Sequence, residues 1–376
     1  MEESPEPKPI ALLDHLAGMP DPRAENKKYP LSTLLAISIL AVLSGADSFE
    51  DIAEFGEERA DWLRGFLYLP KTTPSHDTFN RVFSLLDPSA FASHFSKWTQ
   101  SLAPYIPENV VAIDGKALRG VYDWETGETP YMLSAWSVAK GLCLTSLKVP
   151  QKTNEQTALP DLLNLLYLKG AIVSLDALHC HRNTAEDIVG HEADYLLALK
   201  GNQGELFRDV KTAFEKSDQL NSSETVGAAH GRIEKRVATV LTAPDILTYL
   251  EEVHHWPHLV ALGKIEETRH LHGKQETSER YYLLSKVVTA SDLNWIVRSH
   301  WEVENKLHWV MDMVFNEDRN HTRNAAENLS RLRQLSLNLI RLNPRKHTSL
   351  KTRRKVAAWS PKYLTQLLST AGPQVD

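Results

Sequence analysis

The sequence has few cysteines and no long hydrophobic run. Only Cys143 and Cys180 occur among 376 residues, so no disulfide framework is expected, and this usage fits a reducing cytosol. The longest apolar stretch, Leu31 to Leu43, is interrupted by polar residues and is shorter than the roughly 20 residues that a membrane-spanning helix needs. The acidic, proline-rich N-terminus resembles neither a signal peptide nor a transit peptide. We therefore expect a cytoplasmic protein without a membrane partner.

An excess of positive charge is also absent, because the formal net charge is −6. This balance argues mildly against nucleic acid as a partner, since phosphate binding depends on Lys and Arg side chains. The charges are unevenly distributed, however. Acidic residues crowd the first third of the chain, whereas residues 331–355 contain nine Lys and Arg residues and no acid. The local field, rather than the net charge, decides where a polyanion would bind.

Residues 1–105 are expected to form an N-terminal helical domain. Apolar residues such as Leu34, Ile37 and Leu40 recur near helical spacing, and the segment Thr72–Asp77 offers N-cap residues before a further helix. Two interpretations stay open for this domain. It is either a helix-turn-helix that binds DNA or a helical bundle whose role is packing.

The periodicity changes after Pro107, where short apolar runs alternate with helical segments. Val110–Ile113 is expected to be a buried central strand, followed by two strands joined at 139–141, a helix at about 156–168 and strands ending at Leu175 and Leu199. This order is close to that of ribonuclease-H-like folds. We predict an α/β fold with a ribonuclease-H-like mixed sheet, flanking helices, a β-rich insertion and the N-terminal helical domain.

The remaining boundaries follow from the same pattern. Residues 106–221 are predicted to be the first part of the catalytic core, and residues 222–290, with several strand-like runs, a β-rich insertion. Helical spacing resumes in residues 291–330, which would supply the last helix of the core. Residues 331–376 are predicted to be a basic C-terminal tail.

Three acidic residues stand where catalytic chemistry is expected. Asp114 and Asp176 each end a buried strand, and Glu304 borders a helical apolar stripe that begins at Val303. Glu302 lies about 200° from Glu304, because each residue turns a helix by about 100°, so only one of these glutamates can face the aspartates. Carboxylates at adjacent strand ends can share two divalent ions, an arrangement that suits phosphodiester chemistry. The alternative is that both aspartates merely start turns.

Five segments in a fixed order carry a family resemblance. They are Ile113–Lys116, Leu175–Cys180, Leu199–Gln203, His230–Glu234 and His300–Trp309. Together they resemble the ISAs-type insertion-sequence transposases, the group that includes the H-repeat-associated proteins. The segment Asp21-Pro22-Arg23 stands where that family has a short Asp-Pro-Arg signature. The resemblance covers nearly the whole chain.

The resemblance implies a DDE transposase, which cleaves DNA at the ends of its element and joins the freed 3′-hydroxyl to target DNA. It implies Asp114, Asp176 and Glu304 as catalytic and metal-binding acids, with two Mg²⁺ or Mn²⁺ ions as cofactors. The implied partner is double-stranded DNA, bound at terminal repeats and target sites by a homodimer in a synaptic complex, and the implied location is the cytoplasm with the nucleoid. His300 stands where many relatives have Arg, so this signature does not by itself imply a hairpin intermediate.

Basic, imidazole and amide side chains near these segments are the candidates for contact with DNA. They are Lys116, Arg119, Lys200, Asn202, Gln203, Arg232, His300 and His308. A solvated side chain is nevertheless the commoner role for a single surface Lys, Arg, Asn or Gln. Two other functions stay open: a catalytically silent, transposase-derived regulator that binds DNA, and a metal-dependent nuclease without strand transfer.

Overall fold

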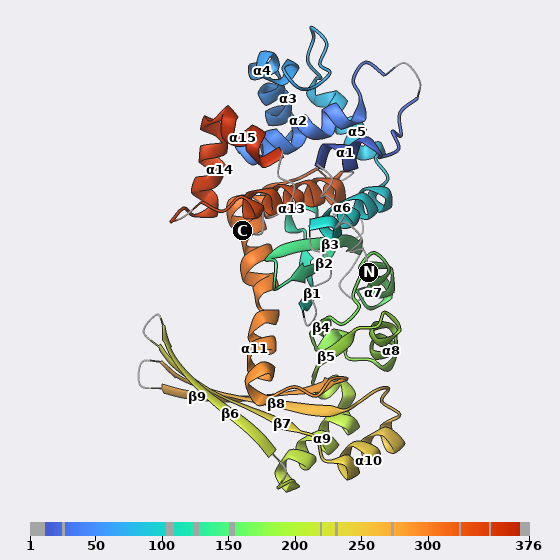
Figure 1. Ribbon diagram of the computed structural model, residues 1–376, viewed down its shortest axis with the longest axis vertical. Coiled ribbons are helices and arrows are strands. Elements are labelled where there is room, and N and C mark those ends of the chain that lie inside the picture. The colour runs from blue at the N-terminus through green and yellow to red at the C-terminus, as the bar shows by residue number, and fades with distance from the viewer. Residues whose placement is uncertain are drawn as a thin grey trace, which may run out of the picture.

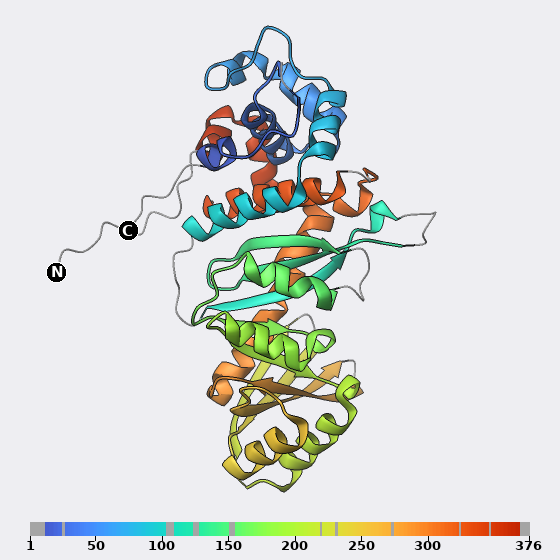
Figure 2. The ribbon, with the colours of Figure 1, turned by 90° about the vertical axis from the view of Figure 1, so that its right-hand side faces the viewer.

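The computed structural model describes most of the chain. The described residues are 12–24, 27–102, 109–122, 128–149, 155–218, 220–229, 232–271, 274–322, 325–345 and 347–368. Helices from both ends of the chain gather at one end of the molecule, a mixed sheet lies in the middle, and four long strands form the other end (Figures 1 and 2). The sheet therefore connects the two ends of the molecule.

The N-terminal region is helical, as predicted. Its helices are α1 (Leu12–Ala17), α2 (Leu31–Ser44), α3 (Phe49–Glu58), α4 (Ala60–Arg64), α5 (His76–Leu85) and α6 (Pro88–Leu102). Helix α2 is buried along most of its length, which accounts for its apolar sequence. Helix α3 begins with a capping box, in which Ser48 and Asp51 each accept a backbone N–H of the other. Among the described residues, no single helix is long and apolar enough to cross a bilayer, although α2 and α3 jointly are, across a 98° bend.

The C-terminal segment folds back onto these helices. Helix α13 (Ala326–Leu342) packs against α2, α6 and the sheet. Helix α14 (Leu350–Trp359) packs against α2, and α15 (Pro361–Leu368) packs against α14 and α13 (Figure 1). Nε of Arg354 in α14 donates to the Val42 carbonyl of α2 at 2.9 Å. The predicted division between residues 330 and 331 falls inside α13, and Arg331 and Arg333 are buried there. These arginines therefore do not belong to an exposed basic tail.

The middle of the molecule contains the five strands that were expected. They are β1 (Val110–Ala117), β2 (Tyr131–Ser137), β3 (Leu142–Val149), β4 (Ile172–Leu175) and β5 (Asp194–Leu199). Their spatial order is β3-β2-β1-β4-β5, with β1 antiparallel to β2 and parallel to β4, and β4 parallel to β5. This is the ribonuclease-H-like arrangement, so the predicted fold class is confirmed.

Helices cover both faces of this sheet. On one face lie α7 (Glu155–Asn164), α8 (Arg182–Gly190) and α9 (Gly204–Lys216). On the other lie α11 (Ala290–His300) and α12 (Trp309–Val314), the latter in the core that includes Ala112 of β1. Successive residues of a strand point to opposite faces. Accordingly Val111 packs in the core that includes α7, whereas its neighbour Val110 packs in the core that includes α11. Both faces of β1 are thereby buried, as its unbroken apolar run predicts.

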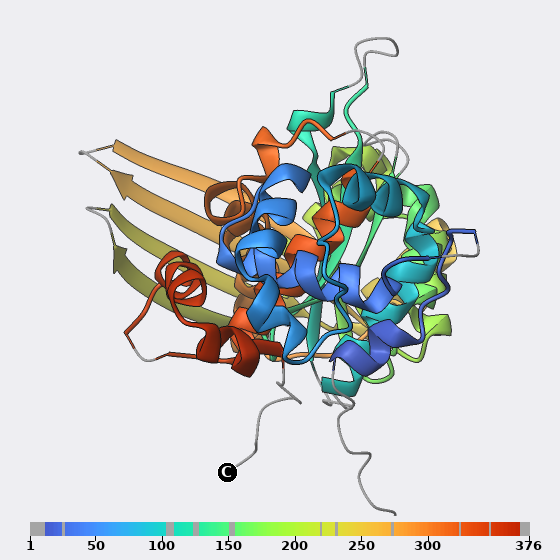
Figure 3. The same ribbon diagram turned by 90° about the horizontal axis from the view of Figure 1, so that it is seen from above.

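Four further strands extend the sheet. They are β6 (Leu220–Ala229), β7 (Arg232–Leu241), β8 (Ala261–Leu271) and β9 (Lys274–Leu284), with α10 (Pro244–His254) between β7 and β8. Strand β9 pairs antiparallel with β5, so these strands continue the same nine-stranded sheet. Their hairpin ends project away from the rest of the molecule (Figure 3). The polar sequence of β6 gave no strand signal.

Candidate active site

The two aspartates lie at neighbouring positions of the sheet. Asp176 directly follows β4, as predicted, whereas Asp114 lies within β1, which continues along β2 to Ala117 and does not end at Asp114 as predicted. The parallel register of β1 and β4 pairs Ala112 with Ser174, and Asp114 and Asp176 each follow two residues later. Asp176 is the N-cap of a short 3-10 helix, η3 (Ala177–His179), and its Oδ1 accepts the N–H of Leu178 at 3.0 Å. The pairing of these strands therefore carries both carboxylates to neighbouring positions.

The third acid comes from a π-helical turn between α11 and α12. This turn, η5 (Val303–His308), contains Glu304 and buries Val303 and Leu307. Glu304 lines the same cavity as the two aspartates, whereas Glu302 forms an ion pair with Lys306 at 2.7 Å. The sequence interpretation assumed a regular α-helix at this point. π-Turns are rare, but those that occur are often found at functional sites. No residue pattern in this sequence predicted one at this position.

The three acids share a cavity of about 310 Å³. Its other lining residues are Leu175, Ala177, Leu196, Ala198, Lys200, Arg280, Tyr282, Val297, His300 and Trp301. Arg280 was not among the sequence candidates. Arg280 lies on β9, and the pairing of β9 with β5 brings it to the cavity. Its guanidinium lies 5.5 Å from the centre of the Trp301 ring and 3.8 Å from the Glu267 carboxylate. The β-rich region thus contributes a cation that sequence spacing could not reveal.

The carboxylates of the cavity repel one another. Burial and the nearby carboxylates of Asp176 and Glu304 raise the pKa of Asp114 to about 7. Burial also raises the pKa of Glu304. Like charges in one site disfavour ionisation, and a bound cation removes that penalty. The acidic oxygens present are the ligands that Mg²⁺ and Mn²⁺ prefer, so the residues fit a divalent ion. Within the described residues, however, no three acidic, His or Cys side chains already have the spacing of a metal site.

Two histidines border the acids and are neutral near pH 7. Burial lowers the pKa of His300 to about 4, and burial together with the charge of Lys116 lowers the pKa of His308 to about 3. Nδ1 of His300 lies 3.0 Å from the Ser174 hydroxyl, and Nδ1 of His308 lies 3.5 Å from Oδ2 of Asp114. Both imidazoles can therefore exchange hydrogen bonds, but neither brings positive charge to a phosphate.

Lys116 does not lie where a DNA contact was expected. Its ammonium is buried and forms ion pairs with Asp312 at 2.7 Å, Glu317 at 2.9 Å and Asp318 at 3.3 Å. The side chain shares a face of β1 with Asp114 and ties that strand to the segment after the π-turn. We therefore remove Lys116 from the DNA-contact candidates, because a buried and neutralised cation cannot reach a phosphate. The exposed Arg119, 3.8 Å from Asp318, remains a candidate.

The other predicted contacts divide between the cavity and the protein backbone. Lys200 is exposed at the cavity. Asn202 and Gln203 instead donate to the carbonyls of Ala177 and Cys180, at 2.7 Å and 2.8 Å. The Arg232 side chain, like residues 230–231 of the same segment, lies outside the described residues.

A buried Glu–His pair behind the aspartates was also missed. Oε2 of Glu155 lies 3.4 Å from Nε2 of His179, and both side chains are almost inaccessible to solvent. The Glu155 carboxylate also packs directly on the backbone of Gly115, where a Cβ atom would collide with it. The only sequence signal for this close approach is the glycine that follows Asp114, because glycine has no Cβ and lets other atoms pack against its backbone.

Two family models match the chain. One, described as "DDE_Tnp_1-associated", covers residues 13–99, and the other, described as "Transposase DDE domain", covers residues 106–339. The chain is 36% identical to "H repeat-associated putative transposase YhhI" of Escherichia coli (strain K12) over 374 residues, which cover 96% of this chain and 98% of the relative. It is 35% identical to "Putative transposase YncI" of Escherichia coli O157:H7 over 372 residues, covering 96% and 95%.

A solved structure shows a weaker likeness. A piggyBac transposase, in a synaptic complex with hairpin DNA, superimposes with a TM-score of 0.42 at 9% identity, covering 97% of this chain and 83% of the other.

The sheet order is ribonuclease-H-like, and the match to the transposase DDE domain model supports a nucleic-acid-processing enzyme of the DDE class. The chain belongs to the DDE transposase family, and its relatives group it with the H-repeat-associated transposases. The resemblance inferred from the five sequence segments is confirmed. Membership of this family supports DNA as the partner and a divalent metal as the cofactor.

Replacing Gly115 by Ala should destabilise the protein. The added methyl group would force the buried Glu155 carboxylate to move, and overpacking of this kind typically costs about 1–3 kcal/mol. The free energy of unfolding would be measured by urea denaturation. Gly190→Ala is the matched control, because nothing lies within 4 Å of a Cβ at that position. Equal stability of the two variants would contradict the close packing of Glu155 on Gly115.

Replacing Lys116 by Met should also destabilise the protein, by about 3–5 kcal/mol, because it leaves the buried Glu317 carboxylate without its partner. The same urea measurement tests this expectation. A variant that kept its stability but bound DNA more weakly would restore Lys116 to the DNA-contact candidates.

Proposed function

We propose that the protein cleaves DNA strands at the ends of its mobile element and transfers the freed 3′-hydroxyl into target DNA, in a metal-dependent reaction. One observation carries the proposal: Asp114, Asp176 and Glu304, far apart in the sequence, line one cavity in a chain of the DDE transposase family. We assign these three acids as the catalytic and metal-binding residues. When bound, divalent ions would activate the attacking oxygen and stabilise the leaving oxygen.

The protein's own groups prepare the carboxylates for this task. Oδ1 of Asp176 accepts the Leu178 N–H, and no described residue binds Oδ2, which is therefore available to a ligand. Oδ2 of Asp114 lies 3.5 Å from Nδ1 of His308, whose neutral imidazole places no competing positive charge beside the carboxylate. The Ser174 hydroxyl lies 3.0 Å from Nδ1 of His300 and holds this second neutral imidazole near Asp176.

We assign Lys200 and Arg280 as the groups that contact the DNA backbone at the cavity. Their charges offset part of the negative charge of the three acids and would attract phosphates on either side of the bond that breaks. The exposed Arg119 and the predicted contact Arg232 stay candidates for further contact with DNA. Trp301 offers an aromatic face beside Arg280.

The N-terminal region is the proposed binding site for the element ends. A cavity of about 430 Å³ in this region is lined by four cationic side chains, those of Arg23, Lys27, Lys28 and Arg81. Arg23 belongs to the Asp-Pro-Arg segment and is fixed by Asp21 at 2.7 Å and by the Tyr29 carbonyl at 2.6 Å. Because Arg23 is paired with Asp21, the exposed Lys27, Lys28 and Arg81 carry the charge that favours DNA binding over a purely packing role for residues 1–105. Joining two ends would require a homodimer in a synaptic complex, acting on chromosomal DNA in the cytoplasm.

Asp176→Ala and Glu304→Ala should reduce strand cleavage to the uncatalysed background, because each removes a proposed metal ligand from the cavity. Folding and binding to the ends should be retained, since neither side chain supports the core. The measurement is Mg²⁺-dependent cleavage of DNA that carries the repeats flanking the gene. Glu302→Ala is the matched control and should cleave normally, because Glu302 pairs with Lys306 outside the cavity.

The outcomes of this assay separate the three functions. Normal cleavage by Glu304→Ala would overturn the assignment, and loss of cleavage only in Glu302→Ala would exchange the roles of the two glutamates. Wild-type cleavage without strand-transfer products would indicate a nuclease. Binding to the ends without cleavage would indicate a regulator.

Arg280→Ala should weaken DNA binding about equally for all sequences and should lower the slope of log affinity against log salt concentration by about one, as expected for the loss of one phosphate contact. Affinities would be measured by fluorescence anisotropy across a salt series. Lys169→Ala is the control, because Lys169 pairs with Glu192 at the opposite edge of the sheet. An unchanged salt slope in Arg280→Ala would exclude Arg280 from the DNA-contacting surface.

A further inference from the structure

The backbone turn that follows Asp176 is held by side chains from two other segments. The carbonyl of Ala177 accepts a hydrogen bond from Nδ2 of Asn202 at 2.7 Å. The Leu178 carbonyl accepts one from Nε2 of Gln156 at 2.5 Å, and the Cys180 carbonyl accepts one from Nε2 of Gln203 at 2.8 Å. We call Gln156, Asn202 and Gln203 the amide clamp.

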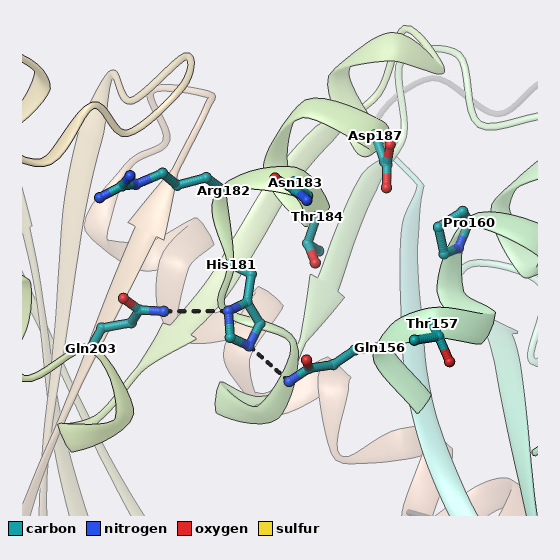
Figure 4. A pocket seen from close by; sticks show the side chains of 9 residues that line it. All are labelled: Gln156, Thr157, Pro160, His181, Arg182, Asn183, Thr184, Asp187 and Gln203. Atoms are coloured by element: carbon teal, nitrogen blue, oxygen red, sulfur yellow. Dashed lines mark hydrogen bonds between the residues drawn. The ribbon is translucent and has the colours of Figure 1, made fainter. Parts of the chain in front are cut away.

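The clamp residues approach the turn from different sides. Gln156 lies in the first turn of α7, whereas Asn202 and Gln203 belong to the 3-10 helix η4 (Gly201–Gln203) that follows β5. In Figure 4, Gln156 and Gln203 reach toward opposite sides of the His181 ring, with nitrogen separations of 2.7 Å and 3.5 Å. The turn is therefore fastened both to the helix on one side and to the next strand end on the other.

The turn depends on these side chains because its two 3-10 hydrogen bonds are long, although the His181 N–H donates to the His179 carbonyl at 2.9 Å. The His179 N–H reaches the Asp176 carbonyl at 3.2 Å, and the Cys180 N–H reaches the Ala177 carbonyl at 3.3 Å. A single 3-10 turn has poor hydrogen-bond geometry and little stability of its own. The shorter bonds from the three amides supply the constraint that the local backbone lacks.

The position of the turn sets the orientation of the Asp176 carboxylate. Leu178 is bound at both of its backbone groups, since its N–H donates to Oδ1 of Asp176 and its carbonyl accepts from Gln156. A shift of this peptide would rotate the carboxylate and move its free Oδ2. Misplacement of a catalytic group by about 1 Å can lower a rate by about 10²-fold.

We propose that Gln156, Asn202 and Gln203 are positioning residues that fix Asp176 for metal binding, an inference that rests on the function proposed above. The amide nitrogens of Asn202 and Gln203, first considered as DNA contacts, act through the protein's own backbone. They play the part that outer hydrogen-bond partners play around many metal sites, where their loss lowers metal affinity or activity by about 10–100-fold.

The test compares Asn202→Asp and Asn202→Ala with the wild type. Both variants lack the donor to Ala177, and the Asp variant keeps the size of the side chain. Its added negative charge would by itself attract a cation, so a weaker metal affinity in this variant cannot arise from charge. Asn183→Ala is the matched control, because Asn183 is an exposed amide on α8 outside the clamp.

Two measurements are needed, and the first uses metal-free protein. Hydrogen exchange of the backbone amides of residues 177–181 should become about two- to tenfold faster in both Asn202 variants, as expected for one lost hydrogen bond. The second measurement is Mn²⁺ binding, followed by electron paramagnetic resonance. The affinity of both variants should fall by about 10–100-fold, and Asn183→Ala should match the wild type in both measurements.

Unchanged exchange in the turn would show that the clamp does not hold it, and would overturn the inference. Faster exchange with wild-type Mn²⁺ affinity would also overturn it, because the turn would then not position Asp176. Failure of the proposed function is distinguishable. If the proposed function is wrong, Asp176→Ala would bind Mn²⁺ as the wild type does, and Asp176 would not be a metal ligand for the clamp to position.

Discussion

The parallel pairing of β1 with β4 is the constraint on which the rest of the site depends. It carries Asp114 and Asp176 to neighbouring positions and leaves one face of β1 to α7 and the other to the helices that follow the β-rich region. Because the two carboxylates are neighbours by register, their mutual repulsion is built into the fold. The surrounding residues either hold these acids in place or offset their charge.

Buried charges connect these positions to the helices at the far end of the molecule. Lys116 binds Glu317, and Glu317 lies in the field of Arg333 on α13, whose guanidinium donates to the Asp47 carbonyl after α2. Arg354 on α14 reaches Asp47 from the C-terminal segment. The helices from both ends of the chain are thus linked to the strand that carries Asp114. A buried network of this kind is costly to break at one member, since the remaining charges lose their partners.

The sequence predicted what depends on local pattern and missed what depends on long-range packing. The strands before Asp114 and Asp176 were visible because strands buried on both faces are continuous apolar runs. The polar strand β6 was not, because its pairing with β7 rather than its own residues makes it a strand. Arg280 reaches the cavity only through the register of β9 on β5. From the sequence, Lys116 is expected to be a surface cation. Its burial is explained only by its ion pairs with acids of α12 and of the segment after α12.

The repulsion among the carboxylates of the cavity lowers the stability of the fold and bears on the proposed function. A carboxyl group whose pKa rises on folding binds more protons in the folded state, so its contribution to stability falls as pH rises from the ordinary value of 3.8 toward 7. For Asp114 this cost approaches about 4 kcal/mol near neutral pH, because each pKa unit corresponds to about 1.36 kcal/mol. A fold under selection for stability alone would replace one of these acids. The presence of Asp114 beside Asp176 and Glu304, with a hydrogen-bonded turn holding Asp176, fits the cation site proposed above, because a bound cation would offset this cost.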